Sequence, residues 1–424
     1  MNLLIDNKTI NSFFLILFSI IPASIVLGPA ISLVNILLID ISFIFFLIYK
    51  KEYKFLSNKT IKLILILYLY LIFNTLISQD FSSAGPRNLG FIRFIIMFCA
   101  LNYFFYNNNF FIKIITIWSI IITLVTVDTY IESIFGKNIL GYGELHGNRI
   151  VSFFKDEPIV GGYINSFYLV IIGYLFTLKK NTEKYKYFIF LFSILFIFAI
   201  LLTGERSNTI RAFLSFLLFY YFIDCFNLKQ KIIFILLSII VTGFLINQSN
   251  FLKLRYGDQV LKPIIAKLKF TQPTTITEEH QLKEFKENLY FKLYNSGFSV
   301  FKNYPFFGVG NKNYRVEACI EKKNSAYLCN THPHQIYLEF LAEHGIVGSF
   351  ILLFIMFRLI FGKIRLILDS TNSIQLGCFI FLIISFTPLL PSGAFFSDYM
   401  ATLFWLNLSL MYAAGKKTNV FSLN

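Results

Sequence analysis

The sequence predicts an all-α integral membrane protein with about 12 transmembrane helices and one large outer loop between helices 9 and 10. Of its 424 residues, 56% are hydrophobic and only 14% are charged, whereas soluble domains are about half apolar and a quarter charged. The mean hydropathy is +0.66. Apolar stretches near the ~20 residues that cross a bilayer occur at 12–27, 31–48, 61–77, 89–106, 112–130, 164–178, 186–203, 208–223, 231–246, 346–361, 374–390 and 395–413.

Basic residues predict the orientation, because lysine and arginine prefer cytoplasmic loops. The basic clusters all fall on one side of the membrane if both termini are cytoplasmic. They are Lys50, Lys51, Lys54, Lys59 and Lys62; Lys179, Lys180, Lys184 and Lys186; Lys229 and Lys231; Arg358, Lys363 and Arg365; and Lys416 and Lys417. The apolar stretch that begins near Phe13 is expected to be a retained helix and not a cleaved signal. The net charge of +15 then reflects topology, and no nucleic-acid partner is predicted.

The large outer loop covers 247–345, in a chain predicted to form a single polytopic membrane domain over 1–424. Loops of this length are uncommon unless they are functional or disordered. Apolar residues recur in it at helical spacing between lysines and glutamates, at Leu282, Phe285, Leu289, Leu293, Phe298 and Phe301. This pattern predicts an amphipathic helix, which could lie on the membrane surface, cover a cavity or simply pack on the bundle.

Two cysteines, Cys319 and Cys329, flank the short polar stretch EKKNSAYL in the same loop. In an oxidising compartment they could form a disulfide that closes this small loop, which would contribute roughly 2–4 kcal/mol. The alternative is a pair of free thiols, and we favour the disulfide.

The loop ends with THPHQIYLEFLAEHGIVG, at 331–348, which holds three of the five histidines in the chain. His334 and Gln335 are followed by nine residues, then Gly345, two residues and Gly348. This spacing, the predicted spans and the long loop resemble the O-antigen ligase and O-antigen polymerase superfamily over the whole chain. Members of that superfamily are membrane enzymes that move an undecaprenyl-diphosphate-linked glycan onto an acceptor at the periplasmic face. The resemblance therefore implies that the 247–345 loop is periplasmic.

Two further stretches carry the resemblance. LLTGERSN, 201–208, is similar to the family's short outer corner, which implies that Arg206 contacts the diphosphate, and YPFFGVGNKNY, 304–314, is similar to its proline and glycine turn. Arg149 resembles another outer-loop arginine of relatives. The family's second loop arginine stands fifteen residues before the proline, where this chain has Tyr290, and either Lys292 or Arg255 could substitute for it.

The arginines also suit the ligand on physical grounds. Guanidinium groups bind phosphate oxygens bidentately and stay charged at any relevant pH. Arg206, in a tight corner between two spans, could alternatively extend toward lipid headgroups. We favour phosphate binding, with the neighbouring Glu205 as a group that could orient the guanidinium.

His334 is the predicted catalytic base. An acceptor hydroxyl must lose its proton as it attacks the sugar, and an imidazole with a pKa near 6.5 suits that role at neutral pH. Diphosphate is already a good leaving group, so a single inverting displacement needs no acid, metal or other cofactor. The alternative is a histidine that merely caps the following helix.

Other residues of the motif have competing interpretations. His332 and His334 could bind zinc with Glu339 or Glu343, although no compact ligand spacing is present. Gln335 could orient His334, contact the sugar or do neither. Gly345 and Gly348 are expected to let helices approach each other closely.

The predicted function is that of an O-antigen ligase, with lipid A core as acceptor and the bacterial inner membrane as location. An O-antigen polymerase would use the same undecaprenyl-diphosphate-linked donor and extend the growing glycan instead. A transporter or flippase for a lipid-linked glycan is the alternative from another class, because broken helices such as PLLPSG, 388–393, suit a substrate path. Against it, ionisable residues gather at the outer surface and not at the midplane of the spans.

Overall fold

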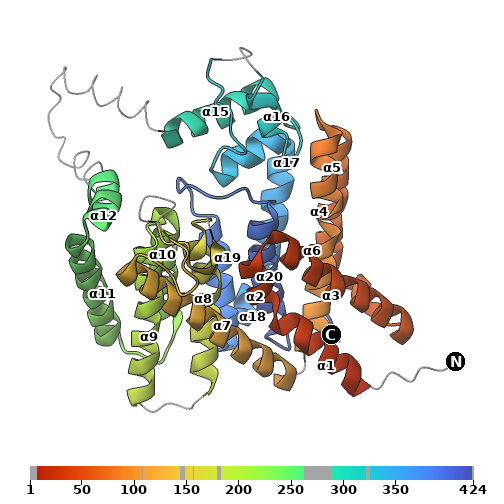
Figure 1. The fold of residues 1–424 in the computed structure, drawn as a ribbon. Coiled ribbons are helices and arrows are strands. Elements are labelled where there is room, and N and C mark those ends of the chain that lie inside the picture. Colours follow the sequence, from red (N-terminus) through yellow and green to blue (C-terminus); the bar gives the residue numbers. More distant parts are fainter. Residues whose placement is uncertain are drawn as a thin grey trace.

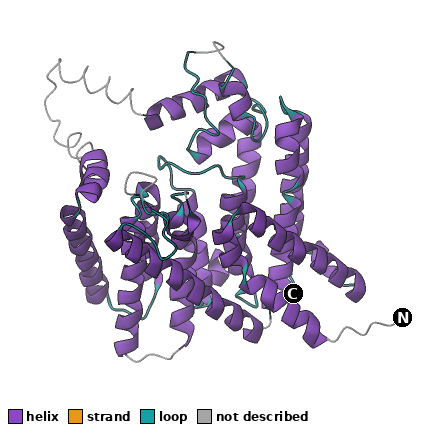
Figure 2. Cartoon of the chain, in the orientation of Figure 1, coloured by secondary structure: helices purple, strands orange, loops and turns teal. Residues whose placement is uncertain are grey.

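The computed structural model describes residues 7–106, 108–143, 149–155, 157–178, 183–261, 289–320 and 325–422. Within these ranges the regular structure is helical and contains no strand (Figures 1 and 2). The all-α prediction therefore agrees with the structure in the described part of the chain.

Eight of the described helices or helix pairs are long and apolar enough to cross a membrane, so the chain is a membrane protein. They are α3 (Pro29–Lys50), α4 (Lys59–Leu76), α5 with α6 (Phe81–Leu89 and Ile92–Phe105), α7 (Asn108–Phe135), α8 (Val160–Leu178), α9 (Glu183–Leu202), α11 (Leu228–Gln248) and α17 with α18 (Ile336–Phe361 and Ile364–Asp369). A ninth span is possible if α1 (Asn7–Ser19) and α2 (Ile21–Leu27), bent by 42°, count as one.

Three further predicted spans coincide with shorter helices. These are α10 (Arg206–Phe222), α19 (Ser373–Ser385) and α20 (Asp398–Ala413), of 17, 13 and 16 residues. A helix of 13 residues rises only about 20 Å, less than the ~30 Å hydrocarbon core. Every predicted apolar stretch therefore overlaps a helix, although 386–390 and 395–397 lie outside α19 and α20, and the number of twelve spans stays a prediction.

Helices α8, α19 and α20 lie at the centre of the bundle. Close packing of α8 on α19 depends on glycine, because a Cβ on Gly377 would lie 2.6 Å from the carbonyl oxygen of Leu169 and one on Gly173 would lie 2.5 Å from that of Ser373. Small residues at such positions let membrane helices approach closely. On α20, the fully buried Trp405 packs edge-on against Phe91. These three helices are therefore closely packed and largely buried.

One end of the bundle carries the loop elements. Helix α15 (Leu289–Asn303), α16 (Tyr314–Ala318) and the start of α17 lie together at the top of Figure 1. The buried residues of α15 include Leu293 and Val300, and α15 packs on α17. The first half of the predicted amphipathic helix, with Leu282 and Phe285, lies outside the described residues. Its second half is a helix packed on the bundle.

The remaining described elements are short. They are η1 (Lys54–Ser57), η2 (Ser152–Phe154), α12 (Asn250–Leu252) and the π-helical η3 (Lys253–Leu261). The last two follow α11 and return the chain to the corner between α9 and α10. This corner and the start of α17 carry most of the predicted site residues.

Candidate functional site

The corner between α9 and α10 is built around Gly204. Its φ of +71° is left-handed, and a Cβ there would lie 2.6 Å from the ring of Phe251. Arg255, on η3, donates from Nε and Nη2 to the carbonyl oxygen of Gly204 at 3.2 and 2.8 Å. Tyr256 anchors the same turn through a 2.8 Å hydrogen bond between its hydroxyl and that of Thr209. The sequence LTGER therefore makes a rigid corner that holds Arg255 beside α10.

Glu205 binds the start of α8. Its carboxylate oxygens accept hydrogen bonds from the backbone N–H groups of Gly161 and Gly162, at 2.7 and 3.1 Å, and from the Asn208 amide at 2.6 Å. Burial raises the pKa of Glu205, and these hydrogen bonds and the positive charge of Arg149 oppose the rise. Glu205 thus joins α8 to α10, a different role from the expected orientation of the Arg206 guanidinium.

Arg206 is half-buried at the first position of α10. Its guanidinium carbon lies 6.0 Å from the centre of the Tyr290 ring, within range of a cation–π interaction. The guanidinium forms no hydrogen bond or ion pair with the described residues. Its donors are therefore available to a ligand.

Three arginines share this region. Burial lowers the pKa of Arg255, and the positive charges of Arg206 and Arg149 lower it further. Arg149 donates from Nη2 to the carbonyl oxygen of Pro158 at 3.0 Å, and its buried Nε has no hydrogen-bond partner among the described residues. The structure thus brings Arg149, Arg206 and Arg255 together. Lys292 is exposed on α15, two positions and so about 200° around the helix from Tyr290.

Tyr290, on α15, connects the arginines to the histidine motif. The centre of its ring lies 6.3 Å from that of His334, edge to face. His334 has a φ of +56° and its carbonyl oxygen accepts a 2.9 Å hydrogen bond from the N–H of Ser392. Its ring nitrogens bond to none of the described residues, and burial lowers the pKa of the imidazole. A neutral, unpaired imidazole at pH 7 can accept a proton.

His332 packs directly on His334, with ring centres 3.9 Å apart. Its Nε2 lies 3.2 Å from the carbonyl oxygen of Ser392, and its Nδ1 lies 3.0 Å from the hydroxyl of Thr331. Because a carbonyl only accepts, the proton is on Nε2. Burial first, and then the neighbouring His334, lower the pKa of His332 to about 4. His332 is therefore a neutral, positioned neighbour of the candidate base.

Gln335 caps α17. Its side-chain oxygen accepts a 2.8 Å hydrogen bond from the N–H of Leu338, and the side chain is 6% exposed. This bond satisfies one of the free N–H groups at the helix start. The capping role that sequence analysis considered for His334 thus belongs to Gln335.

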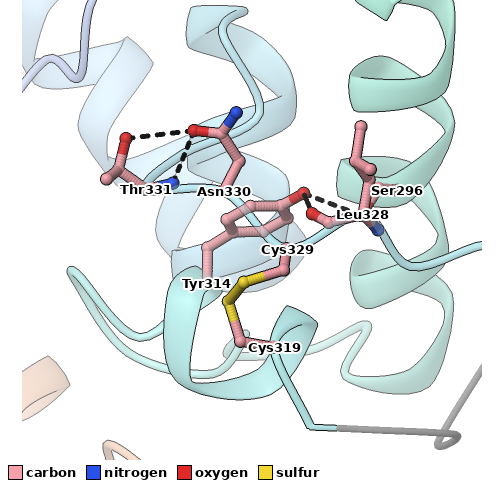
Figure 3. Close-up of a disulfide and its surroundings, with 7 residues drawn as sticks. All are labelled: Ser296, Tyr314, Cys319, Leu328, Cys329, Asn330 and Thr331. Atoms are coloured by element: carbon pink, nitrogen blue, oxygen red, sulfur yellow. Dashed lines mark hydrogen bonds between the residues drawn. A yellow bond between two sulfur atoms is a disulfide. The ribbon is translucent and has the colours of Figure 1, made fainter.

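A disulfide joins Cys319 and Cys329, with the sulfurs 2.05 Å apart (Figure 3). Beside it, the Ser296 hydroxyl accepts a 2.9 Å hydrogen bond from the N–H of Leu328 and bonds to the Tyr314 hydroxyl at 2.7 Å. The segment that leads into the histidines is therefore held against both α15 and α16.

The proline and glycine turn docks into a break in α17. Gly345 has φ +64° inside the helix, and a Cβ there would lie 2.3 Å from the backbone of Phe306. Across this break, the N–H groups of Val309 and Gly310 in the turn donate to the carbonyl oxygens of Ala342 and Glu343 in the helix. In return, the N–H groups of Ile346 and Val347 in the helix donate to the carbonyl oxygens of Pro305 and Phe306 in the turn. A Cβ on Gly348 would lie 1.8 Å from the Tyr70 hydroxyl of α4. The two glycines permit contact with two different neighbours.

The alternative zinc site is not assembled in the part of the chain that the structure describes. No three His, Cys, Asp or Glu residues lie close enough there to hold a metal ion. Both carboxylate oxygens of Glu339 accept from the N–H of Phe395, at 2.9 and 3.1 Å. Glu343 accepts from the N–H of Tyr314 at 3.3 Å. The glutamates thus hold neighbouring backbone in place.

A family model described as O-antigen ligase matches residues 191–353. The predicted resemblance to the O-antigen ligase and polymerase superfamily is confirmed over these residues. The matched segment includes the α9–α10 corner, Tyr290, the disulfide, and the motif from His334 to Gly348. No curated protein matches the chain. The family match supports a ligase or polymerase type of function on lipid-linked glycan and acceptor substrates in general.

Sequence analysis missed three basic residues near the histidine motif. Arg87 of α5, and Lys312 and Arg315 at the start of α16, line a cavity of 680 Å³ together with His332. Arg87 precedes the matched segment and lies on α5, outside every stretch that sequence analysis considered for the site. Its proximity to His332 comes from tertiary packing, which no local spacing in the sequence reveals.

Proposed function

We propose that the protein is an O-antigen ligase, an inverting and metal-independent glycosyltransferase that moves a glycan from undecaprenyl diphosphate to lipid A core. One observation carries the proposal. Arg206, with its guanidinium donors unpaired among the described residues, and His334, with its ring nitrogens equally unpaired there, both lie against the ring of Tyr290. A cation for the leaving group and a base for the nucleophile are thus separated by about the width of one side chain.

The donor diphosphate would bind at the corner between α9 and α10. Arg206 and Arg149 would bind its oxygens, and Arg255 would add charge while its bond to Gly204 O fixes its position. Arginine forks match phosphate oxygens and keep their charge when partly buried. These charges would also stabilise the diphosphate as it leaves, which is where negative charge develops.

His334 would accept the proton of the acceptor hydroxyl. The hydroxyl oxygen forms a bond to the anomeric carbon from the face opposite the diphosphate, and the bond between that carbon and the phosphate oxygen breaks with its electron pair. Undecaprenyl diphosphate leaves, and the proton stays on the imidazole until it passes to water. The lowered pKa of His334 keeps the imidazole neutral and able to act as a base at pH 7.

The proposed periplasmic location of the site is supported by where the basic loops lie. Lys50, Lys51, Arg358 and Lys363 line one cavity of 1640 Å³, along with Asn11 and Phe421 from near the two ends of the chain. Arg358 is roughly 30 Å along α17 from the histidine motif at a helical rise of 1.5 Å per residue. Lysine and arginine prefer cytoplasmic loops. This cavity would therefore be cytoplasmic, as would both termini, and the histidines would face the periplasm.

The test is glycan transfer from undecaprenyl diphosphate to an acceptor by the purified protein in the presence of a chelator. Wild type is compared with His334→Ala and Arg206→Ala, and Lys302→Gln, a change of an exposed charge on α15, is the matched control. The proposal expects transfer by wild type and the control and loss of transfer in the two site variants while they remain folded. Full activity of His334→Ala would overturn its role as base, and no transfer by wild type to any acceptor would favour the transporter.

Acceptor identity separates ligase from polymerase. A strain that lacks a ligase accumulates lipid-linked polymer that does not reach core. A strain that lacks a polymerase leaves core that carries a single repeat unit. The ligase proposal expects the first pattern, with complementation by wild type and not by His334→Ala.

A further inference from the structure

A basic cavity adjoins the histidine pair. It has a volume of 680 Å³, within the range of small-molecule sites, and four segments of the chain form its walls. These are α5, the turn with α16, and the loops before α17 and α20. The lining residues are Ser83, Arg87, Lys312, Arg315, Val316, Cys319, Thr331, His332, Ala394 and Ser397.

The charge of this cavity is positive. Arg87, Lys312 and Arg315 line it, and among the described residues no aspartate or glutamate does. The side chains of these three cations form no hydrogen bond or ion pair with the described residues. Two buried glutamates, Glu339 and Glu343, are near enough to feel the charge of Arg87, but neither reaches the cavity surface.

The cavity is held next to the proposed base by ring packing and by a disulfide. His332 forms part of the wall and packs on His334 with ring centres 3.9 Å apart. Cys319, also in the wall, is bonded to Cys329 at the start of the segment that carries Thr331 and His332 (Figure 3). None of the three arginines proposed for the diphosphate lines this cavity. Two separate sets of cations therefore meet at the histidine pair.

We propose that this cavity binds an anionic group of the acceptor, a phosphate or a carboxylate, and thereby presents a neighbouring acceptor hydroxyl to His334. This inference rests on the proposed transferase function and names the acceptor class for it. Guanidinium and ammonium groups without partners recognise phosphate and carboxylate oxygens through charge-assisted hydrogen bonds. The anion could come from a phosphorylated core lipid or from an acidic sugar at the end of a growing glycan, and the experiment distinguishes the two.

The test compares charged and uncharged acceptors with the full-length protein. The probes are phosphorylated lipid A core and the same lipid after chemical removal of its phosphates, and a glycan that ends in a uronic acid and its carboxyl-reduced form. The variants are Arg315→Gln and Lys312→Gln, both at exposed positions, with Lys302→Gln as the matched control. Acceptor KM, donor KM and kcat are measured for each, and acceptor binding is measured in nanodiscs without donor.

The inference expects the two cavity variants to raise the acceptor KM or Kd for one charged probe roughly tenfold, the size of one lost charge-assisted hydrogen bond. Donor KM, and the constants for the uncharged form, should not change. The charged probe that shows the effect identifies the source of the anion.

Equal constants for wild type and both cavity variants on every charged probe would overturn the inference and leave the transferase proposal intact. A wild type that transfers to no acceptor would overturn the transferase proposal. The binding measurement would then still decide whether the cavity recognises an anion, since it requires no transfer.

Discussion

The guanidinium of Arg206 lies 6.0 Å from the centre of the Tyr290 ring. The same ring lies 6.3 Å from that of His334. Tyr290 stands where the family's second loop arginine is expected. At this position the chain therefore has no positive charge, and an aromatic ring lies near both Arg206 and His334. Arg255, held by Gly204, brings an arginine to this site from η3 instead.

Two replacements of Tyr290 should show whether its aromatic ring or its hydroxyl group contributes to transfer. Tyr290→Ala removes the cation–π contact with Arg206 and the ring against His334, and we expect transfer to fall about tenfold, in line with ~0.5–2 kcal/mol for such contacts. Tyr290→Phe keeps the ring and should stay close to wild type. Transfer rates at saturating and limiting donor measure both. Equal loss in the two variants would show that the hydroxyl is what matters.

Arg206→Lys should not restore the function that Arg206→Ala loses. Lysine keeps the charge but lacks the planar fork that binds two phosphate oxygens, and the loss of one charged hydrogen bond corresponds to roughly a tenfold rise in donor KM. Donor titrations with wild type, the two variants and Lys302→Gln provide the measurement. A donor KM for Arg206→Lys equal to that of wild type would mean that only charge, and not bidentate geometry, is required.

The pH profile should report the neutral form of His334. Because burial lowers its pKa below 6.5, the base is already deprotonated at pH 7, and kcat/KM should be flat there and fall only as the pH drops below 6.5. Burial and the neighbouring His334 lower the pKa of His332 in the folded protein to about 4. In the unfolded chain this histidine therefore binds a proton at a higher pH, near 6.5, so the folded state should lose stability as the pH falls below 6.5. Thermal unfolding at each pH separates the two effects. An acid limb centred above pH 7 would contradict the assignment.

Loss of the disulfide should loosen the approach to the histidines. Its removal in Cys319→Ser with Cys329→Ser, or by reductant, is expected to lower stability by roughly 2–3 kcal/mol for a loop of this size. We expect a lower Tm and faster proteolysis between α16 and α17. Cys225→Ser, at a free and half-buried cysteine, is the control and should behave like wild type. Unchanged proteolysis in the double variant would show that packing of Tyr314 and Ser296 is sufficient.

Patterns along the chain predicted the helices well, because apolar runs must be buried or face lipid wherever they occur. The same argument could not count the spans, since α19 has only 13 residues and its depth depends on neighbours. The motif around His334 and the arginine of the corner were indicated by the resemblance to the O-antigen ligase and polymerase superfamily and by the chemistry of imidazole and guanidinium groups. The contacts between them were not, because Tyr290 and Arg255 reach the site through the packing of α15 and η3, which no local period encodes.

The contacts of Glu205 could not be predicted for a related reason. Glu205 is adjacent to Arg206 in sequence, which suggested that its carboxylate orients the guanidinium. In the structure the carboxylate instead accepts hydrogen bonds from the N–H groups of Gly161 and Gly162. A helix start offers several free donors at once, so it competes well with a single guanidinium. Arg87 was missed because Lys312, Arg315 and His332, with which it lines the cavity, lie more than two hundred residues away in sequence.

The break in α17 provides the sharpest test of the fold around the site. In Gly345→Ala the new Cβ would need the left-handed φ of +64° and would lie 2.3 Å from the backbone of Phe306, a site that cannot yield by rotating a side chain. We expect a loss of about 1–3 kcal/mol from the conformation alone, a lower Tm and loss of transfer, since the turn 304–311 would detach from α17. Gly243→Ala is the matched control, because a Cβ there meets nothing within 4 Å and a helix interior accepts alanine at a gain of roughly 0.5–1 kcal/mol. If both variants unfold at the wild-type temperature, the turn does not depend on the glycine, and the break in α17 has to be explained by something other than the docking of the turn.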